Sequence, residues 1–209
     1  MKIEKVDEAL ATKHANAIPD LVFSTGPSSY TYYFQTRPVF DMIVNKSWEM
    51  PGTLFAQDAC HFALDDGKLA GFLLSFEASE FRPRGDALAP VWHDLFAAGL
   101  MNEAGFADFL ERAEYARWLN PDTRPGIYYI HAVAARPEFK GQGVGAALIA
   151  KSIELARERD FNKVELDVLS DNPAVGFYHS HGFEIVAETK APKPFAAGVP
   201  VEYRMSLKL

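Results

Sequence analysis

The segment RPEFKGQGVGAALIAKSIELA, residues 136–156, places three closely spaced glycines at the start of a long helical pattern. It follows IYYIHAVA, residues 127–134, whose apolar residues on both faces predict a buried central strand. A glycine-rich turn between a strand and a helix exposes backbone N–H groups that lack a helical acceptor, and such groups bind anions. Glycine lets a phosphate approach the backbone closely, and Lys140 adds a positive charge. The segment therefore predicts a pyrophosphate site.

The spacing of the glycines argues against two common phosphate-binding folds. A P-loop ends in Gly-Lys-Ser/Thr, whereas Gly145 is followed by Ala146 and Ala147. A dinucleotide fold carries Gly-x-Gly-x-x-Gly near its first strand, whereas Gly141-x-Gly143-x-Gly145 occurs late in this chain, after a hairpin. A nucleotide-binding domain therefore remains only a third reading, and affinity for ATP or NAD would reveal it.

Upstream of the glycines, the pattern predicts a strand hairpin followed by inserted helices. Asp65-Asp66-Gly67-Lys68 separates HFAL from LAGFLLSF, and an Asp-Gly turn between two apolar runs is typical of a hairpin. The insertion at about 82–124 has apolar residues at helical spacing, which predicts two amphipathic helices. These residues are Leu88, Val91, Trp92, Leu95 and Phe96, then Phe106, Phe109, Leu110, Ala113, Trp118 and Leu119.

The N-terminal part of the chain has a less regular pattern. Residues 2–6 alternate polar and apolar and predict a short strand, after which Asp7 could cap a helix that runs toward Ile18. Residues 23–34 are interpreted as a turn-rich aromatic loop, and residues 38–48 as a helix.

Downstream of the glycine turn, the helix is expected to run from about Gly143 to Arg159. A strand at 163–169 with one more polar face follows, then a short helix from Pro173 whose C-cap is Gly182. The last two strands are expected at residues 183–188 and 201–208, where polar and apolar residues alternate.

Composition places the chain among packed globular proteins, since 48% of its 209 residues are hydrophobic and 23% are charged. We expect one domain over residues 1–209 that carries the insertion. A net charge of −7 without a basic cluster argues against a nucleic-acid partner.

Location and redox state follow from what the sequence lacks. No window reaches about 18 apolar residues, and the N-terminus has no apolar stretch like that of a signal peptide, so we expect no membrane partner. The single Cys60 cannot form an intramolecular disulfide and is interpreted as a buried apolar side chain. These features indicate a cytoplasmic protein.

Two separate motifs resemble those of the GNAT N-acetyltransferases. The glycine turn is similar to that family's Gln/Arg-x-x-Gly-x-Gly/Ala pattern, with Lys140 where Gln or Arg is usual. The segment from Asn172 to Tyr178, NPAVGFY, followed by HGF at 181–183, is similar to the family's Asn…Ala…Tyr…Gly-Phe segment. The resemblance covers residues 127–188, and the element order from about His61 agrees with it. It implies an α/β GNAT fold, a mixed sheet of about seven strands splayed between two parallel strands. The helical pair predicted from spacing is inserted before the central strand and is not part of the resemblance.

The resemblance also implies a cofactor, acetyl-CoA, and residues that bind it. Coenzyme A would lie between the splayed strands at 127–134 and 163–169. The predicted cofactor-binding residues are Ala132, Val133, Ala134, Lys140, Gly141, Gln142, Gly143, Val144, Gly145, Ala146, Asn172 and Tyr178. The backbone N–H of Val133 would polarise the thioester carbonyl, although an ordinary strand valine fits the same position.

The resemblance implies a catalytic role for one residue and leaves the general base open. Tyr178 stands where family members place a phenol that protonates the departing thiolate, and the alternative is an aromatic packing residue. The amine must lose a proton, for which the candidates are His131, Glu77 and Glu80. His131 could equally be a core histidine, and the glutamates surface charges. Some family members carry a glutamate early on the central strand, but here that stretch reads Ile127-Tyr128-Tyr129, so the base stays unassigned.

The acceptor is expected to be the primary amine of a small molecule, with a peptide or protein amine as the nearest variant. The inserted helices and the aromatic residues around Tyr30 would form the wall of its pocket, or the helices of Trp92 and Trp118 would bury a homodimer interface. A non-catalytic acyl-CoA sensor is the alternative function. No metal is expected, because His179 and His181 lack further ligands nearby.

Overall fold

The computed structural model describes residues 1–119 and 124–209; the side chains of residues 115–119 also lie outside the description. Within these residues, seven strands form one mixed sheet in the order β1-β2-β3-β4-β5-β7-β6. Only β4 and β5 pair in parallel. The strands are β1 (Lys2–Lys5), β2 (Cys60–Asp65), β3 (Lys68–Glu77), β4 (Ile127–Ala135), β5 (Lys163–Leu169), β6 (Glu184–Thr189) and β7 (Glu202–Lys208). The expected fold class is therefore confirmed.

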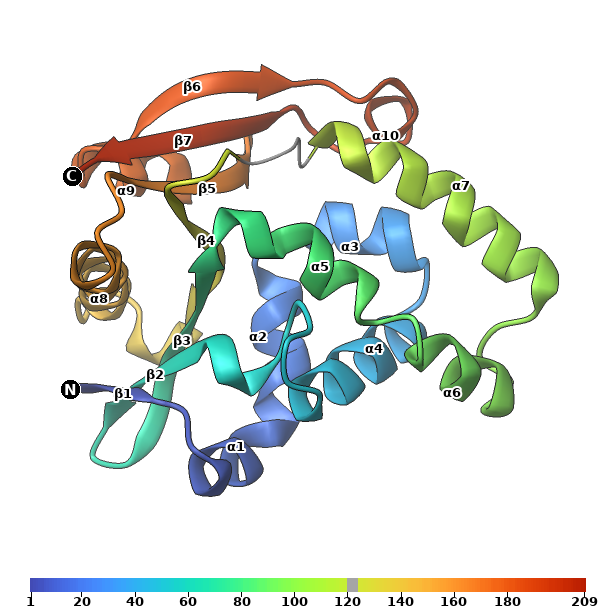
Figure 1. Cartoon of the computed structure of the whole chain (residues 1–209), viewed down its shortest axis with the longest axis horizontal. Coiled ribbons are helices and arrows are strands. Elements are labelled where there is room, and N and C mark those ends of the chain that lie inside the picture. The colour runs from blue at the N-terminus through green and yellow to red at the C-terminus, as the bar shows by residue number, and fades with distance from the viewer. Residues whose placement is uncertain (120–123) are drawn as a thin grey trace.

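Helices cover both faces of the sheet, with α8 and α9 on one side and α2 to α7 on the other (Figure 1). Neighbouring residues of β3 show why both faces need cover. Leu73 packs into one apolar cluster with Leu148 of α8, while Phe72 and Leu74 pack into the other with Phe40 of α4. The helices are α1 (Glu8–His14), α2 (Ile18–Ser24), α3 (Pro27–Phe34), α4 (Arg37–Glu49), α5 (Phe81–Asp86), α6 (Val91–Ala97), α7 (Glu103–Leu119), α8 (Val144–Glu158), α9 (Ala174–Ser180) and α10 (Pro192–Ala196).

Local signals in the sequence account for several element boundaries. Asp66 and Gly67 have φ of 48° and 75°, the two positive values of a type I′ hairpin turn, and they join β2 to β3. Asp7 caps α1, because its side chain accepts a hydrogen bond from Leu10 N at 2.8 Å. Cys60 is fully buried, as the sequence predicts.

The two central strands separate at one end, and this separation creates the site. β4 pairs with β5 only from Ile127↔Lys163 to Ile130↔Leu166. Beyond that point β5 continues along β7, while β4 continues along β3. Leu74 pairs with Ala132 and Ser75 with Ile130, so His131 is the extra residue of a β-bulge. The bulge bends β4 away from β5 and leaves backbone groups facing the gap.

Two predictions of local structure are wrong. Residues 23–34 are not a loop, because α2 runs to Ser24 and α3 occupies Pro27–Phe34. Pro27 begins α3, and Tyr30, one helical turn from Phe34, packs on Phe40 with ring centroids 4.9 Å apart.

In the part of the insertion that the structure describes, three helices are found instead of two. Leu88 lies in the turn before Pro90, which caps α6, so the predicted first helix is split into α5 and α6. Trp92 packs within the chain, against Phe109 at 4.7 Å between ring centroids. The predicted side-chain roles of Trp118 and Leu119 lie outside the described residues, and the homodimer interface stays a prediction.

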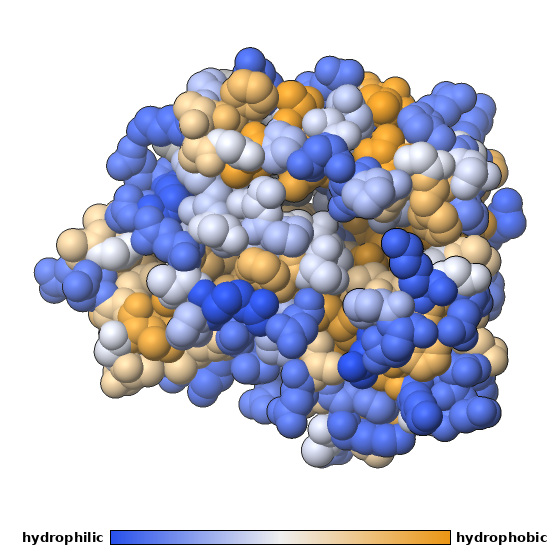
Figure 2. Space-filling model, turned by 180° about the vertical axis from the view of Figure 1, so that it is seen from behind, coloured by the Kyte–Doolittle hydropathy of each residue, from blue (hydrophilic) through white to orange (hydrophobic). Residues whose placement is uncertain are grey.

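Among the described helices, none combines the length and the apolar character of a bilayer-spanning segment. On the face seen from behind, hydrophobic residues lie in separate patches between hydrophilic ones (Figure 2).

Candidate active site

The glycine turn leads directly into α8 and leaves its N-terminus open. Gly141 and Gly143 have φ of 80° and 78°, and Gly143 is the N-cap, so both use the left-handed region that favours glycine. No side chain caps the helix. The first N–H groups of α8 are therefore available to an anion. Gly145 has a different role, because a Cβ there would lie 3.2 Å from Phe177 Cζ of α9.

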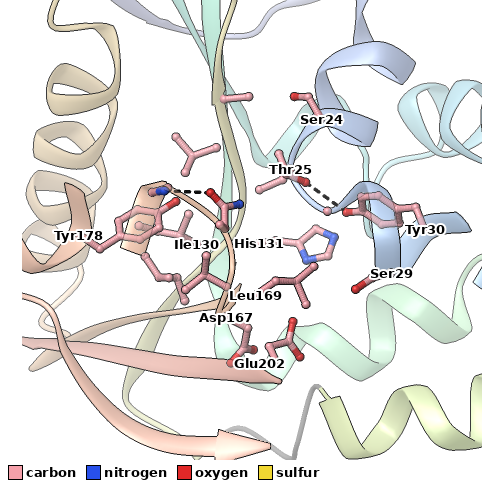
Figure 3. A pocket seen from close by; sticks show the side chains of 18 of the residues that line it. Ser24, Thr25, Ser29, Tyr30, Ile130, His131, Asp167, Leu169, Tyr178 and Glu202 are labelled. Atoms are coloured by element: carbon pink, nitrogen blue, oxygen red, sulfur yellow. Dashed lines mark hydrogen bonds between the residues drawn. The ribbon is translucent and has the colours of Figure 1, made fainter. Parts of the chain in front are cut away.

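A cleft of about 390 Å³ occupies the gap between β4 and β5. Its walls include six residues that the sequence singles out: His131, Ala132, Val133, Ala134, Asn172 and Tyr178. The glycine turn itself, residues 140–146, is not part of these walls. In Figure 3, Tyr178 and Tyr30 lie on opposite sides of His131, and Glu202 lies beyond Asp167 near the last strand. The structure thus joins residues from the N-terminal helices, the central strands and α9.

Tyr178 comes from α9 and is buried against Phe177 and Phe183. Burial raises the pKa of its phenol to about 12, because the ionised form loses hydration. The phenol is therefore protonated at neutral pH, as a proton donor must be.

Asn172 shapes the loop between β5 and α9. Its Oδ1 accepts a hydrogen bond from Ala174 N at 2.9 Å, which fixes the first turn of α9 and so the position of Tyr178. The side-chain amide still lines the cleft.

His131 sits at the bulge among aromatic rings. The rings of Phe55, Phe76 and Phe81 lie 5.3, 5.6 and 5.6 Å from its own. Burial, and secondly the charge of Arg84, lower the pKa of His131 to about 4. The ring is therefore neutral at pH 7. Its buried Nε2 has no hydrogen-bond partner and could accept one from a ligand.

The two predicted glutamates lie elsewhere. Glu77 ends β3, opposite Tyr128, and Glu80 accepts a hydrogen bond from Arg84 Nε at 2.9 Å. Neither side chain is among those that line the cleft. The geometry gives no support to a role for them in proton transfer.

Glu202 is a candidate that the sequence analysis missed. It is the first residue of β7, pairs with Leu169, is only 9% exposed and lines the cleft. Its Oε2 is buried without a partner. Burial, and then repulsion from Asp167, raise the pKa of Glu202 well above its usual value. The alternation on β7 does not reveal this burial, because Glu202 belongs to the polar set of the strand.

The buried side of β7 faces complementary charges on β5. Opposite charges on these two strands were the sequence signal that could have indicated a buried polar side. Arg204 donates from Nε to Asp167 Oδ1 at 2.9 Å and from Nη2 to Oδ2 at 2.6 Å. Tyr129 Oη also donates to Asp167, at 2.7 Å. The network fixes β5 to β7 where β5 leaves β4, and so it supports one wall of the cleft.

His179 and His181 are engaged locally: their Nδ1 atoms lie 3.0 and 2.8 Å from the carbonyl oxygens of Phe183 and Phe177. Among the described side chains, no group of three or more His, Cys, Asp or Glu is placed to hold a metal ion.

The buried histidines predict how stability depends on pH. The pKa of His131 and that of His61 are both lowered to about 4, chiefly by burial, so between pH 6.5 and 4 the unfolded chain binds these protons first. The free energy of unfolding should therefore fall as the pH falls through this window, by on the order of 3–5 kcal/mol for the pair. Urea unfolding at pH 7 and 4.5 measures it. His131→Gln with His61→Gln should flatten the dependence, and the exposed His93→Gln should not.

Comparison with known proteins agrees with this geometry. The model of the acetyltransferase (GNAT) family matches residues 24–183. An uncharacterized N-acetyltransferase of Methanocaldococcus jannaschii is 40% identical over 68 residues, which are 32% of this chain and 30% of that protein. A putative [ribosomal protein bS18]-alanine N-acetyltransferase of Bacillus subtilis is 36% identical over 53 residues, 25% of this chain and 35% of that protein. The chain thus spans about a third of the curated relatives' length.

Solved structures match over the whole length. An N-acetyltransferase from Staphylococcus aureus Mu50 has a TM-score of 0.67 at 16% identity, with 99% of this chain and 100% of that chain covered. The NatC complex bound to Gag peptide and CoA has a TM-score of 0.54 at 13% identity, with 100% and 99% covered. At these identities the likeness shows the fold alone, while the family match covers most of the chain. The protein therefore belongs to the acetyltransferase (GNAT) family.

Proposed function

We propose that the chain transfers the acetyl group of acetyl-CoA to the primary amine of a small molecule, by direct attack in a ternary complex. The observation that carries this proposal is the cleft between β4 and β5, which opens at His131, together with the uncapped N-terminus of α8 that follows β4 in the chain. A helix N-terminus suits the diphosphate, and an open strand edge suits the amide groups of pantetheine.

The cofactor would then be held mainly by backbone groups. In this proposal the N–H groups of residues 141–146 bind the diphosphate, and Lys140 and Gln142 flank it from the surface. The freed edge of Ala132, Val133 and Ala134 pairs with the pantetheine arm, and the Val133 N–H polarises the thioester carbonyl.

The chemistry needs one bond to form and one to break. The amine nitrogen bonds to the thioester carbon, and the carbon–sulfur bond breaks with its electron pair on sulfur. An alkylammonium loses two protons overall: one ends on the CoA thiol and the other reaches solvent. Tyr178 supplies the proton to sulfur, and the neutral His131 accepts a hydrogen bond from the nitrogen as it loses a proton.

Tyr178→Phe should lower kcat more than tenfold while the affinity for CoA is retained. The change removes only the phenol oxygen, and a thiol of pKa about 8.5 still leaves without help, so activity should not vanish. Steady-state thiol release measures kcat, and calorimetry measures CoA binding. Phe177→Leu, next to Tyr178 and outside the cleft walls, is the packing control. An unchanged kcat in Tyr178→Phe would assign Tyr178 to packing.

Thiol release from acetyl-CoA against polyamines, aminoglycosides, amino acids and peptides tests the proposal itself. The ribosomal-protein-alanine relative gives a reason to include peptides with N-terminal alanine. Tight CoA binding without release on any amine would instead support a sensor.

A further inference from the structure

A second cavity lies behind the bulge of β4. This inner chamber has a volume of about 350 Å³, at the lower end of the range for small-molecule sites. It shares Tyr30, Tyr33 and His131 with the cleft between β4 and β5, so the two spaces meet at the His131 ring. A ligand in the chamber would therefore lie beside the point where the thioester is expected.

The walls of the inner chamber are apolar and largely aromatic. They include Phe34, Phe55, Phe81, Leu88, Trp92 and Phe109. The last three come from the insertion, so the insertion forms part of the chamber wall. Arg82 and Asp86 also line it, and both are exposed, which places charge at the surface end. A polar occupant would find few hydrogen-bond partners deeper inside.

The cleft beside the inner chamber is lined by polar atoms that lack partners. Tyr33 Oη, His131 Nε2 and Glu202 Oε2 are all buried without a hydrogen bond, and all three side chains line the cleft. The charge of Glu202 also acts on Tyr33, which shows that the two are near each other. Such atoms are costly to bury unless a ligand satisfies them. Each of the three can accept a hydrogen bond, and a primary ammonium has three N–H donors.

We propose that the acceptor is a small primary amine that carries a bulky apolar group, aryl or branched alkyl. The nitrogen lies at Tyr33, His131 and Glu202, and the apolar group fills the inner chamber. This inference rests on the proposed acetyl transfer and narrows it to one class of amine. A polar amine or a peptide would leave the chamber walls in contact with water or with unpaired polar groups.

Matched amines test this choice. With acetyl-CoA, 2-phenylethylamine and 3-methylbutylamine should give kcat/KM values at least about 30-fold above those of ethanolamine and an Ala-Gly-Gly peptide, because apolar burial is the added contribution. Equal values would overturn the inference and leave acetyl transfer intact. Calorimetry with CoA and 2-phenylethylamine does not depend on turnover: binding supports the chamber, and its absence overturns the inference. Absence of CoA binding would instead remove the proposed function.

Gly85→Leu tests whether the chamber itself holds the apolar group. A Cβ at Gly85 would lie 3.7 Å from Leu54 Cδ1, so the larger side chain extends along the chamber wall without a backbone clash. We expect the KM for 2-phenylethylamine to rise at least about tenfold while CoA affinity is kept. Ala97→Leu, an exposed residue of α6 outside the chamber, is the matched control. An unchanged KM in Gly85→Leu would overturn the assignment of the chamber.

Glu202→Gln tests the proposed binding site of the amine nitrogen independently of the inner chamber. Gln keeps the shape but presents an N–H₂ donor where the carboxyl group of Glu202 can accept, so the KM of aryl and polar amines alike should rise at least about tenfold. Gly85→Leu should instead act on the bulky amines. A loss of kcat with no change in KM, or lower thermal stability alone, would contradict a role for Glu202 in amine binding.

Discussion

Gly143→Asp should weaken CoA binding at least about 100-fold, a loss of about 2.7 kcal/mol. Two effects add. Gly143 has φ of 78°, a conformation that costs an L-residue roughly 1–2 kcal/mol. The new carboxylate would also stand at the N-terminus of α8, where the proposal places the diphosphate, and like charges repel strongly there. Calorimetry with CoA measures the affinity directly.

Two control variants separate strain from charge. Gly143→Ala introduces the strain alone and should lose about tenfold or less. Gly99→Asp introduces a charge at another glycine with positive φ, 67°, where a Cβ meets nothing within 4 Å, and should leave CoA affinity unchanged. Wild-type affinity in Gly143→Asp would show that the diphosphate does not bind at this turn.

Arg204→Met should lower the free energy of unfolding by about 3–5 kcal/mol at pH 7. Arg204 makes two hydrogen bonds to Asp167, whose side chain is 4% exposed, and it lies 3.9 Å from Glu165. Methionine has a similar length but leaves these carboxylates buried without a cation, which is the costly case. Urea unfolding monitored by circular dichroism gives the change.

A surface control and a pH series sharpen this test. Lys208→Met removes a cation from the exposed end of the same strand and should change stability by no more than about 0.5 kcal/mol. The loss in Arg204→Met should shrink as the pH is lowered, because protonation removes the unpaired charge on the carboxylates. A loss below about 1 kcal/mol at pH 7 would show that the ion pair does not hold β5 to β7.

Local sequence chemistry identified the elements that form the cofactor cleft. Glycines at Gly141 and Gly143 before a helix, an Asp-Gly turn and an apolar strand at 127–134 each depend on neighbours within a few residues. Such signals can be recognised from the sequence alone, and together with the motif at 172–183 they indicated the correct family. The strand at 163–169 was located to the residue for the same reason.

Other features depend on residues far apart in the chain. The helix at Pro27–Phe34 is stabilised by packing on Phe40. Its own polar, turn-forming composition does not record this contact, and it therefore predicted a loop. In the sequence, Glu202 resembles a surface residue of an alternating strand. Its position at the cleft follows only from the pairing of β7 with β5, in which Arg204 donates a hydrogen bond to Asp167. Glu77 stays a prediction as the base, because it ends β3 opposite Tyr128 and does not line the cleft.

By itself, the sequence determined the family, the order of the central elements and the turn proposed to bind diphosphate, because each rests on local backbone requirements. Only the tertiary structure decided where β4 parts from β5, which polar atoms lie buried without partners and how the insertion forms an aromatic chamber behind His131. The physical reason is that burial and unpaired hydrogen-bond donors or acceptors are properties of surfaces brought together from distant segments, and no local pattern records them.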